Sequence, residues 1–323
     1  MTPERRRDLV KQHARTLGFD TAGIADLTPT PHGAELKAWL ADGMAGTMRY
    51  MHRQAAHRLR PSTIAPGATR AVVVTKNYYN ADPPGRSDAG QVAKYARGRD
   101  YHDALRDPLR QLASYIVSLG EDATFARGFV DAGPVPEREL AQRAGLGWIG
   151  KNTMLIDPHR GSFSFLASVL TNLDLALDPP FEADRCGSCR RCLDACPTAA
   201  FPRERVLDSR LCISYLTIEL SGDVDRGLEA LMGSWIFGCD ICQDVCPWNT
   251  KFATATADPA LQLDSSLALL DLEELSHIDD HEFDRRYGWT PLERARPQGM
   301  RRNARIALAN TRREAQCPTS PTR

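Results

Sequence analysis

Eight of the nine cysteines in this 323-residue chain lie between residues 186 and 249, and their spacing limits the folds that this part can adopt. A first run has the pattern C-x2-C-x2-C-x3-C and is followed at once by Pro197. A second run, C-x2-C-x3-C before Pro247, has one cysteine fewer, and Cys212 upstream can supply the missing one. Clustered cysteines of this kind are more typical of metal or redox sites than of a disulfide scaffold.

The first run has the spacing of bacterial ferredoxins, in which three thiolates bind one [4Fe–4S] cluster and the fourth binds its neighbour. This spacing predicts two clusters, with one ligand exchanged between the runs. Two zinc sites are the alternative, but zinc does not require three cysteines at x2 spacing followed by x3-C-P. The predicted ligands are Cys186, Cys189, Cys192 and Cys246 for cluster one, and Cys239, Cys242, Cys212 and Cys196 for cluster two.

The rest of the composition indicates an ordinary globular protein. Hydrophobic residues make up 42% of the chain and charged residues 25%, so a sizeable core can form without disulfides. The formal net charge is zero and excludes no class of partner. No segment approaches the roughly 18 apolar residues of a membrane span, and no apolar stretch follows the first arginines. We therefore expect a cytoplasmic protein with no membrane contact, in which Cys317 is a free thiol without a role.

The residues before the cysteine runs alternate between helical and strand patterns. Thr2 and Pro3 fit the cap and first turn of a helix. An apolar stripe over residues 103–120 predicts a second helix with Pro108 in its first turn, and Pro136 opens a third. Strands are expected over residues 70–79, 123–131 and 163–172. This alternation favours an α/β layer domain, although the strand order does not follow from it.

Charge and cysteine content divide the later part of the chain. Residues 252–284 contain nine Asp or Glu and no Lys or Arg, whereas residues 285–313 contain nine Arg and one Glu, a formal charge of +8. Such a patch can bind phosphates, and Tyr287 and Trp289 within it could stack on an unpaired base. The alternative is a helix surface paired with the acidic stretch, with Trp289 in the core. We expect four parts: 1–180, 181–252, 253–313 and a disordered tail at 314–323.

Asp131 is the candidate reaction residue. It is expected to end a strand just before the helix that Pro136 opens, where α/β domains place functional residues. A desolvated carboxyl there would have a raised pKa and could act as a general acid near neutral pH. An ordinary N-cap or turn aspartate is the alternative. Some 180 residues precede the cysteines, more than electron transfer alone requires, so the clusters are expected to supply electrons to this domain.

Two other segments are less specific. Gly145, Gly147 and Gly150 form G-x-G-x-x-G, but they follow a helix rather than a strand. A chain-reversing loop with close backbone approach is therefore favoured over a dinucleotide site. The segment KYARGRDYH, residues 94–102, is either a solvated polar loop or a loop that faces a phosphate or cofactor, and the sequence leaves both open.

Four segments together resemble the epoxyqueuosine reductases, and the resemblance covers nearly the whole chain. They are KYARGRDYH, VDAGPVPERELAQRAGLGWIGKN, CGSCRRCLDACPTAA and IFGCDICQDVCPWN. The resemblance implies an α+β protein, with an α/β cobalamin-binding N-terminal domain, a bacterial-ferredoxin-like module of two [4Fe–4S] clusters and a short helical C-terminus. It also implies an oxidoreductase that reduces epoxyqueuosine to queuosine at the wobble position of tRNA, using base-off cobalamin that the clusters reload.

By this motif match, Asp131 corresponds to the family's proposed proton donor, and the eight cysteines correspond to its cluster ligands. Arg58, Lys94, Ser214 and Asp240 fall near positions expected to contact cobalamin. The implied partners are the tRNA anticodon stem-loop and an external low-potential electron donor, and we expect a monomer. Some relatives carry a C-terminal helical-repeat extension, so this chain resembles a short form.

Two other functions remain open at this point. A reductive dehalogenase-like cobalamin enzyme would act on a small molecule, but such proteins usually carry a twin-arginine signal, and the arginine patch would then have no role. His159 in D-P-H-R-G is not predicted to bind cobalt, because the glycine is one residue early for the D-x-H-x-x-G motif. A ferredoxin-type electron carrier would bind no cobalamin and would not depend on Asp131.

Overall fold

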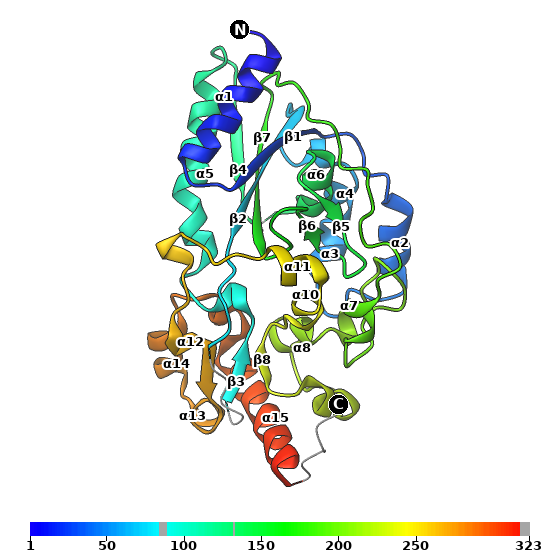
Figure 1. The fold of residues 1–323 in the computed structure, drawn as a ribbon, viewed down its shortest axis with the longest axis vertical. Coiled ribbons are helices and arrows are strands. Elements are labelled where there is room, and N and C mark those ends of the chain that lie inside the picture. Colours follow the sequence, from blue (N-terminus) through cyan, green and yellow to red (C-terminus); the bar gives the residue numbers. More distant parts are fainter. Residues whose placement is uncertain (84–88, 132, 317–323) are drawn as a thin grey trace.

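The computed structural model describes residues 1–83, 89–131 and 133–316. Figure 1 shows a layered part at the N-terminal end, short helices of the cysteine-rich segment in the middle, and a small sheet with the long helix α15 at the other end. The helices are α1 (Pro3–Thr16), α2 (Gly33–Ala41), α3 (Arg49–Arg53), α4 (Ala55–Leu59), α5 (Tyr101–Ser118), α6 (Glu137–Arg143), α7 (Arg191–Asp194), α8 (Ile213–Ile218), α9 (Arg226–Glu229), α10 (Ile241–Asp244), α11 (Pro247–Phe252), α12 (Ser265–Ala268), α13 (Leu272–His277), α14 (Asp280–Tyr287) and α15 (Arg296–Gln316). The strands are β1 (Thr21–Asp26), β2 (Arg70–Asn77), β3 (Ala89–Val92), β4 (Ala126–Phe129), β5 (Trp148–Ile149), β6 (Leu155–Ile156), β7 (Ser164–Thr171), β8 (Trp235–Phe237) and β9 (Leu269–Asp271).

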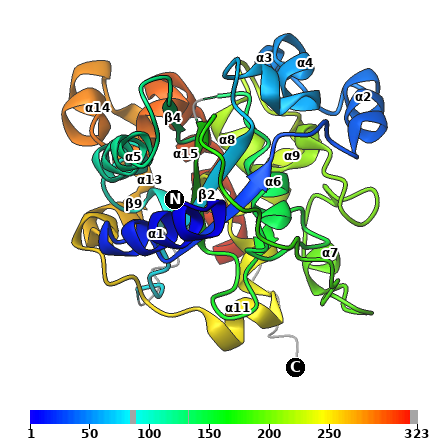
Figure 2. The ribbon, with the colours of Figure 1, turned by 90° about the horizontal axis from the view of Figure 1, so that it is seen from above.

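The main sheet has the order β1-β2-β7-β4, and all its neighbouring strands are antiparallel. Helices cover both faces, with α1 and α5 on one side and α6 on the other (Figure 2). Val72 and Val74 pack in the core beneath α1 and α5, whereas Ala71 and Val73 pack against α6. A strand buried on both faces has a continuous apolar run instead of an alternating one. β2 and β7 confirm the strands predicted over residues 70–79 and 163–172.

The antiparallel pairing changes one expectation about the N-terminal domain. The layering of helices on a sheet is as expected, but placing functional residues at the carboxyl ends of strands is a rule for parallel sheets. In this fold the rule therefore does not support a functional role for Asp131. β4 also ends at Phe129, so Asp131 lies beyond the strand, with φ of 48°.

Of two predicted helix starts, one is confirmed and the other is wrong. Thr2 caps α1, its hydroxyl accepting a hydrogen bond from the backbone N–H of Arg5 at 3.3 Å. α5 begins at Tyr101, so Pro108 lies inside the helix and not in its first turn. The helix starts earlier because Asp100 caps it, accepting from the backbone N–H of His102 at 2.9 Å.

A second sheet joins distant parts of the chain. β3 lies between β8, to which it is parallel, and β9, to which it is antiparallel. Val92 of β3 packs in a core with Phe237 of β8 and with Met300 and Ala304 of α15. This pairing places residues just after β3, including Lys94, next to the cysteine-rich segment.

The C-terminal end differs from the expected disordered tail. α15 continues to Gln316, so residues 314–316 are helical. The remaining tail residues, among them Cys317, lie outside the described residues. Within the described ranges, no helix combines the length and apolar character that crossing a membrane requires.

Candidate active site

A cavity of about 580 Å³, here called the main cavity, brings the predicted acid and predicted cluster ligands together. Asp131 lines it together with Cys212, Cys239 and Cys242, which belong to the predicted cluster-two set. Its other lining side chains include Arg58, Tyr78, Tyr95, Tyr101, Glu137, Arg138, Asn152, Ser162, Phe165, Ser214, Asp240 and Gln243. A cavity of this size is within the usual range for a bound ligand.

Asp131 is held by a tyrosine and not by a helix start. Its Oδ2 accepts a hydrogen bond from the Tyr101 hydroxyl at 2.7 Å, and its backbone N–H donates to Glu137 Oε1 at 3.3 Å. The N-cap alternative is wrong, because Pro136 precedes α6 and that position has no side-chain cap bond. Aspartate tolerates positive φ better than most residues, so the backbone can turn here and leave the carboxyl exposed to the cavity.

A second carboxyl lies beside Asp131. Burial, and then the nearby negative charge of Asp131, raise the pKa of Glu137 to about 8. The same two causes raise the pKa of the Tyr101 hydroxyl, which therefore stays a hydrogen-bond donor. The main cavity thus contains one carboxyl bound by a neutral phenol and another that retains its proton near neutral pH.

Of the four predicted cobalamin contacts, Arg58, Ser214 and Asp240 line the main cavity. Arg58 donates through Nη2 to Gln54 Oε1 at 3.3 Å, whereas its buried Nε has no hydrogen-bond partner among the described residues. A buried donor without a partner costs free energy, so this atom is suited to an acceptor on a bound ligand.

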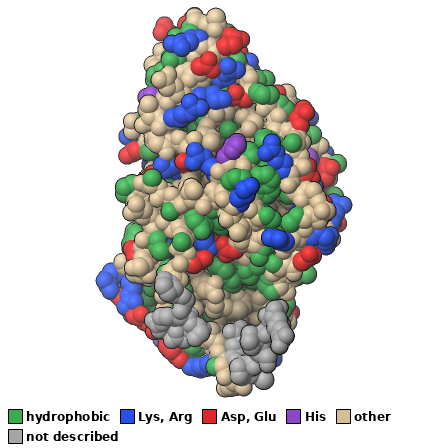
Figure 3. All heavy atoms as spheres, viewed as in Figure 1, with side chains coloured by type: hydrophobic (Ala, Val, Ile, Leu, Met, Phe, Trp, Pro, Cys, Tyr) green, Lys and Arg blue, Asp and Glu red, His purple; other side chains and the backbone are tan. Residues whose placement is uncertain are grey.

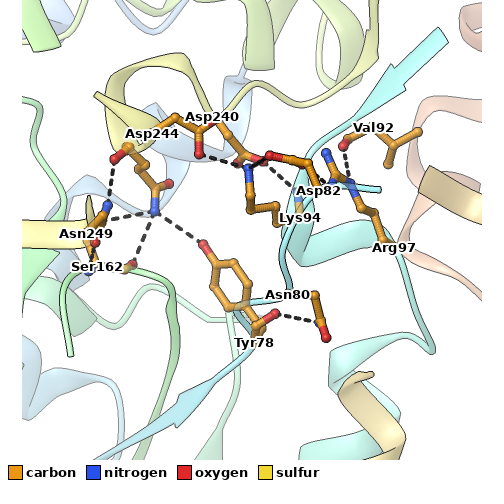
Figure 4. A network of polar contacts seen from close by, with 11 residues as sticks. Tyr78, Asn80, Asp82, Val92, Lys94, Arg97, Ser162, Asp240, Asp244 and Asn249 are labelled. Atoms are coloured by element: carbon orange, nitrogen blue, oxygen red, sulfur yellow. Dashed lines mark hydrogen bonds and ion pairs between the residues drawn. The ribbon is translucent and has the colours of Figure 1, made fainter. Parts of the chain in front are cut away.

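Lys94 lies behind the cavity lining, in the polar network that Figure 4 shows. Its ammonium group lies 2.9 Å from Asp82, 2.8 Å from Asp244 and 3.8 Å from Asp240. Its backbone N–H donates to Asp240 Oδ2 at 2.7 Å. Burial raises the pKa of Asp240 to about 6, although the positive charge of Lys94 opposes this shift. In this structure Lys94 positions Asp240 and does not itself reach the cavity.

The cysteines line two cavities. The four predicted for cluster one, Cys186, Cys189, Cys192 and Cys246, line a separate cavity of about 350 Å³, here called the outer pocket. Three of the four predicted for cluster two line the main cavity, whereas Cys196 lines neither cavity. The division of the eight thiols between two clusters stays a prediction.

These thiols lie close together, so they can all lose their protons only if a positive charge is bound beside them. Burial and neighbouring thiols raise the pKa of Cys192 to about 11, and they also raise the pKa of Cys239 and Cys242. Iron or zinc would supply that charge. Among the described residues, no three His, Cys, Asp or Glu side chains are placed to hold a single metal ion.

The glycine-rich segment forms the predicted close-approach loop. Gly145 has φ of 77° and Gly147 φ of 157°, and a Cβ on Gly145 would lie 2.6 Å from the carbonyl oxygen of Pro179. The loop leads to Asn152, which lines both cavities and donates to the Cys242 carbonyl at 3.3 Å. The chain therefore reverses where the two cavities meet.

The segment KYARGRDYH is structural in part and lines the main cavity in part. Arg97 is 4% exposed and donates to the Val92 carbonyl at 2.6 Å and to Asp82 at 2.5 Å. Tyr95 and Tyr101, by contrast, line the main cavity, and Tyr101 contacts Asp131. The sequence did not single out Glu137 or Arg138, although both lie in the motif that begins at Asp131.

The arginine-rich stretch follows mainly the alternative interpretation. Four of its arginines pair with the acidic stretch, as Arg285 and Arg286 do with Glu282, Arg301 with Asp280, and Arg312 with Glu273. Tyr287 is 6% exposed and packs in the core, so the prediction that it stacks on a base is wrong. Trp289 is 46% exposed and is not a core residue.

Comparison with known proteins agrees with these features. Residues 58–132 match the family described as "Epoxyqueuosine reductase QueG, DUF1730", and residues 185–249 match the "4Fe-4S double cluster binding domain". The epoxyqueuosine reductase of Pseudomonas aeruginosa is 40% identical over 313 residues, which cover 95% of this chain and 86% of that protein. That of Escherichia coli is 37% identical over 306 residues, covering 93% and 80%.

Solved structures extend the similarity to the whole fold. A crystal structure of epoxyqueuosine reductase with a tRNA-Tyr epoxyqueuosine-modified stem loop has a TM-score of 0.87 at 27% identity, covering 98% of this chain and 86% of that one. The Bacillus subtilis enzyme, with its catalytic aspartate loop swung out of the active site, has a TM-score of 0.87 at 28% identity, covering 97% and 84%. With relatives this similar over nearly its full length, the chain belongs to the epoxyqueuosine reductase family of oxidoreductases and contains the family's double [4Fe–4S] domain.

Proposed function

We propose that this chain reduces epoxyqueuosine to queuosine at the wobble position of tRNA. Cobalamin would bind in the main cavity, two [4Fe–4S] clusters would reload it with electrons, and Asp131 would donate a proton. The supporting observation is that Asp131 lines the same cavity as Cys212, Cys239 and Cys242. With a cluster on these cysteines, an electron source and a proton source would meet at one site.

The reaction defines what the side chains have to do. Opening the epoxide and releasing its oxygen as water takes two electrons and two protons, and it leaves a carbon–carbon double bond. The Tyr101 hydroxyl, bound to Asp131 Oδ2 at 2.7 Å, orients the carboxyl so that its other oxygen can hold the transferable proton. A positioned acid of this kind contributes roughly 10²–10⁴-fold to a rate. Glu137, with its raised pKa, is a second proton store beside it.

The residues of the main cavity fit cobalamin. The unpartnered Nε of Arg58, together with Ser214 and Asp240, offers polar groups to the amide and phosphate groups of the cofactor. Lys94 would support the site through Asp240. When bound, cobalamin supplies a strongly reducing, nucleophilic cobalt centre, and the protein positions and shields it.

We further propose that each cysteine group holds one [4Fe–4S] cluster. Cys186, Cys189, Cys192 and Cys246 would bind the cluster of the outer pocket, and Cys196, Cys212, Cys239 and Cys242 the cluster beside the main cavity. The exchange of Cys196 and Cys246 between the runs keeps the two clusters close, as electron transfer between them requires. The outer cluster would receive electrons and the inner one would deliver them.

tRNA is the proposed macromolecular substrate, since a family member has been crystallised with a modified stem loop. In this chain, arginine pairing with the acidic stretch leaves less free positive charge than the composition indicates. The exposed Trp289 remains suited to stacking on an unpaired base. The cytoplasmic location, the monomeric state and the four-part division of the chain stay predictions.

Nucleoside analysis of tRNA tests the substrate. A deletion strain should accumulate epoxyqueuosine, and the wild-type gene should restore queuosine, whereas a gene encoding Asp131→Asn should not. Normal queuosine in the deletion strain would contradict the proposal. Anaerobic protein mixed with cobalamin should also show a bound-cofactor spectrum, which a simple electron carrier would lack.

A further inference from the structure

The outer pocket differs from a buried cluster site because it opens onto an aromatic surface. Trp148 stacks on Phe181 at 5.6 Å between ring centroids and meets Trp248 edge-on at 4.9 Å, and Trp248 stacks on Phe252 at 5.5 Å. Trp248 and Phe252 line the pocket together with the four cysteines. Figure 3 shows hydrophobic side chains over the middle of this face, where α10 and α11 lie in the same view of Figure 1.

Cationic side chains surround this aromatic surface, here called the outer face, and lie exposed on it. The Arg185 guanidinium lies over the Phe181 ring at 5.3 Å, and the Lys251 ammonium lies over Phe252 at 5.0 Å. Across the described ranges, neither of these two cations forms an ion pair with a carboxylate. Blue side chains beside the hydrophobic patch in Figure 3 agree with this arrangement.

The main cavity, by contrast, contains the groups proposed for the reaction. The acid, the proposed cofactor contacts and the inner cysteines all line it, so substrate and cofactor would cover that route to the clusters. The outer pocket therefore remains accessible to an external electron donor. An apolar centre with exposed cations around it is complementary to an acidic protein that carries its redox centre near the surface.

We propose that the outer face, formed by Arg185, Trp248, Lys251 and Phe252, is the docking surface for a small acidic electron-transfer protein. This inference rests on the proposed function, because it assigns the electron donor to the cluster of the outer pocket. With a flavodoxin as donor, its anionic hydroquinone loses one electron and becomes the neutral semiquinone. The oxidised [4Fe–4S]²⁺ cluster gains that electron and becomes [4Fe–4S]⁺.

The test measures reduction of the clusters and not turnover. Oxidised holoenzyme is mixed with reduced flavodoxin in a stopped-flow instrument, and bleaching of the cluster absorbance is followed. The double variant Arg185→Glu/Lys251→Glu should slow this bimolecular step by at least about tenfold, and raising the salt from about 50 to 300 mM should slow the wild type by about the same factor. Calorimetry should show weaker flavodoxin binding by the variant.

The control double variant Arg226→Glu/Arg313→Glu changes the same number of charges at exposed positions on α9 and near the end of α15. It should accept electrons from flavodoxin as fast as the wild type. Reduced methyl viologen, a small cation, should reduce the Arg185/Lys251 variant no more slowly than the wild type, and equal iron content should exclude cluster loss.

Three outcomes would overturn the proposal. These are equal rates of cluster reduction by flavodoxin in the Arg185/Lys251 variant and the wild type, a wild-type rate independent of salt, or blockage of cluster reduction when cobalamin and tRNA are bound at the main cavity. Because bleaching needs neither tRNA nor cobalamin, a wrong substrate assignment would leave this result unchanged. A wrong docking surface would likewise leave the nucleoside test of the reductase unchanged.

Discussion

The outer pocket and the main cavity are both lined by cysteines, but the side chains around these cysteines differ. Aromatic rings and exposed cations surround the outer group. Asp131, Glu137 and the tyrosines surround the inner one. The ligands are chemically alike, so the difference in role comes from the side chains around each group: one set suits contact with a partner protein, and the other suits proton-coupled chemistry.

Iron counting gives the largest expected effect and tests the division into two groups. Cys196→Ala and Cys239→Ala should each lower iron from about eight to about four per chain and abolish turnover, because the inner cluster is lost. If these two cysteines serve the same cluster, the double variant should also retain about four irons.

The matched control combines Cys196→Ala with Cys189→Ala, from the same sequence run. It should leave almost no iron, since one ligand of each cluster is lost. If this pair kept four irons while the pair at 196 and 239 kept none, the two runs would bind separate clusters and the exchange of ligands would be refuted.

Asp131→Asn tests the reaction side of the comparison. The amide keeps the shape and can accept from Tyr101, but it is not an acid, so turnover on a modified tRNA stem loop should fall roughly 10²–10⁴-fold. Iron content and cobalamin binding should match the wild type. Asp194→Asn, at an exposed position on α7 near the outer group, is the control and should retain turnover. Full activity in Asp131→Asn would rule out the acid role.

Glu137 in the main cavity is expected to make the free energy of unfolding depend on pH. The outer pocket is not expected to contribute in this way. Its folded-state pKa of about 8 lies above the unfolded value, so the folded state binds the extra proton. This contribution to stability is fully present below about pH 4.3 and is lost as the pH rises through about 8. Glu137→Gln should therefore gain roughly a few degrees of melting temperature relative to the wild type between pH 5 and pH 8.5.

Thermal melts at several pH values measure this difference, with Glu35→Gln on α2 as the control at an exposed site. The control should follow the wild-type curve at every pH. A constant offset between Glu137→Gln and the wild type across the range would mean that Glu137 is ionised throughout.

The smallest expected effect concerns the outer cluster alone. The indole Nε1–H of Trp148 donates to Cys186 Sγ at 3.4 Å, and hydrogen bonds to cluster sulfurs favour the reduced, more negative state. Trp148→Phe should lower the potential of that cluster by on the order of 40 mV, equivalent to about 1 kcal/mol for one electron. Trp248→Phe keeps the aromatic packing and the backbone N–H, and in the described part of the chain the Trp248 indole has no bond to a cysteine sulfur, so this change should leave the potential unchanged.

Much of the fold could be predicted from local pattern, and the errors have physical causes. The caps and apolar stripes of α1 and the buried runs of β2 and β7 are local properties, and the predictions agree with the structure. The start of α5 was misplaced because the Asp100 cap begins the helix at Tyr101, which leaves Pro108 inside it. The antiparallel order of the sheet could not be predicted, since pairing depends on contacts between strands far apart in the chain.

The candidate site shows the same division. The motif beginning at Asp131 marked one important residue, but Tyr101 reaches it only because α5 and the segment after β4 pack side by side. For the arginine-rich stretch, the sequence predicted more functional surface than the fold leaves free. Its composition indicated a free positive patch, whereas folding pairs four of the arginines with acidic residues that precede them in the chain.

By itself, the sequence determined the metal chemistry of this protein, because the number and spacing of cysteine sulfurs within short loops restrict which clusters they can bind. Only the tertiary structure decided what each cluster would face. Asp131 and Asp240 come from separate segments and line one cavity, with Lys94 bound to Asp240 behind it. Strand pairing and core packing bring these segments together, and they leave cations such as Lys251 exposed. Ligand spacing is a local property, whereas pocket lining and free charge depend on which distant surfaces burial brings together.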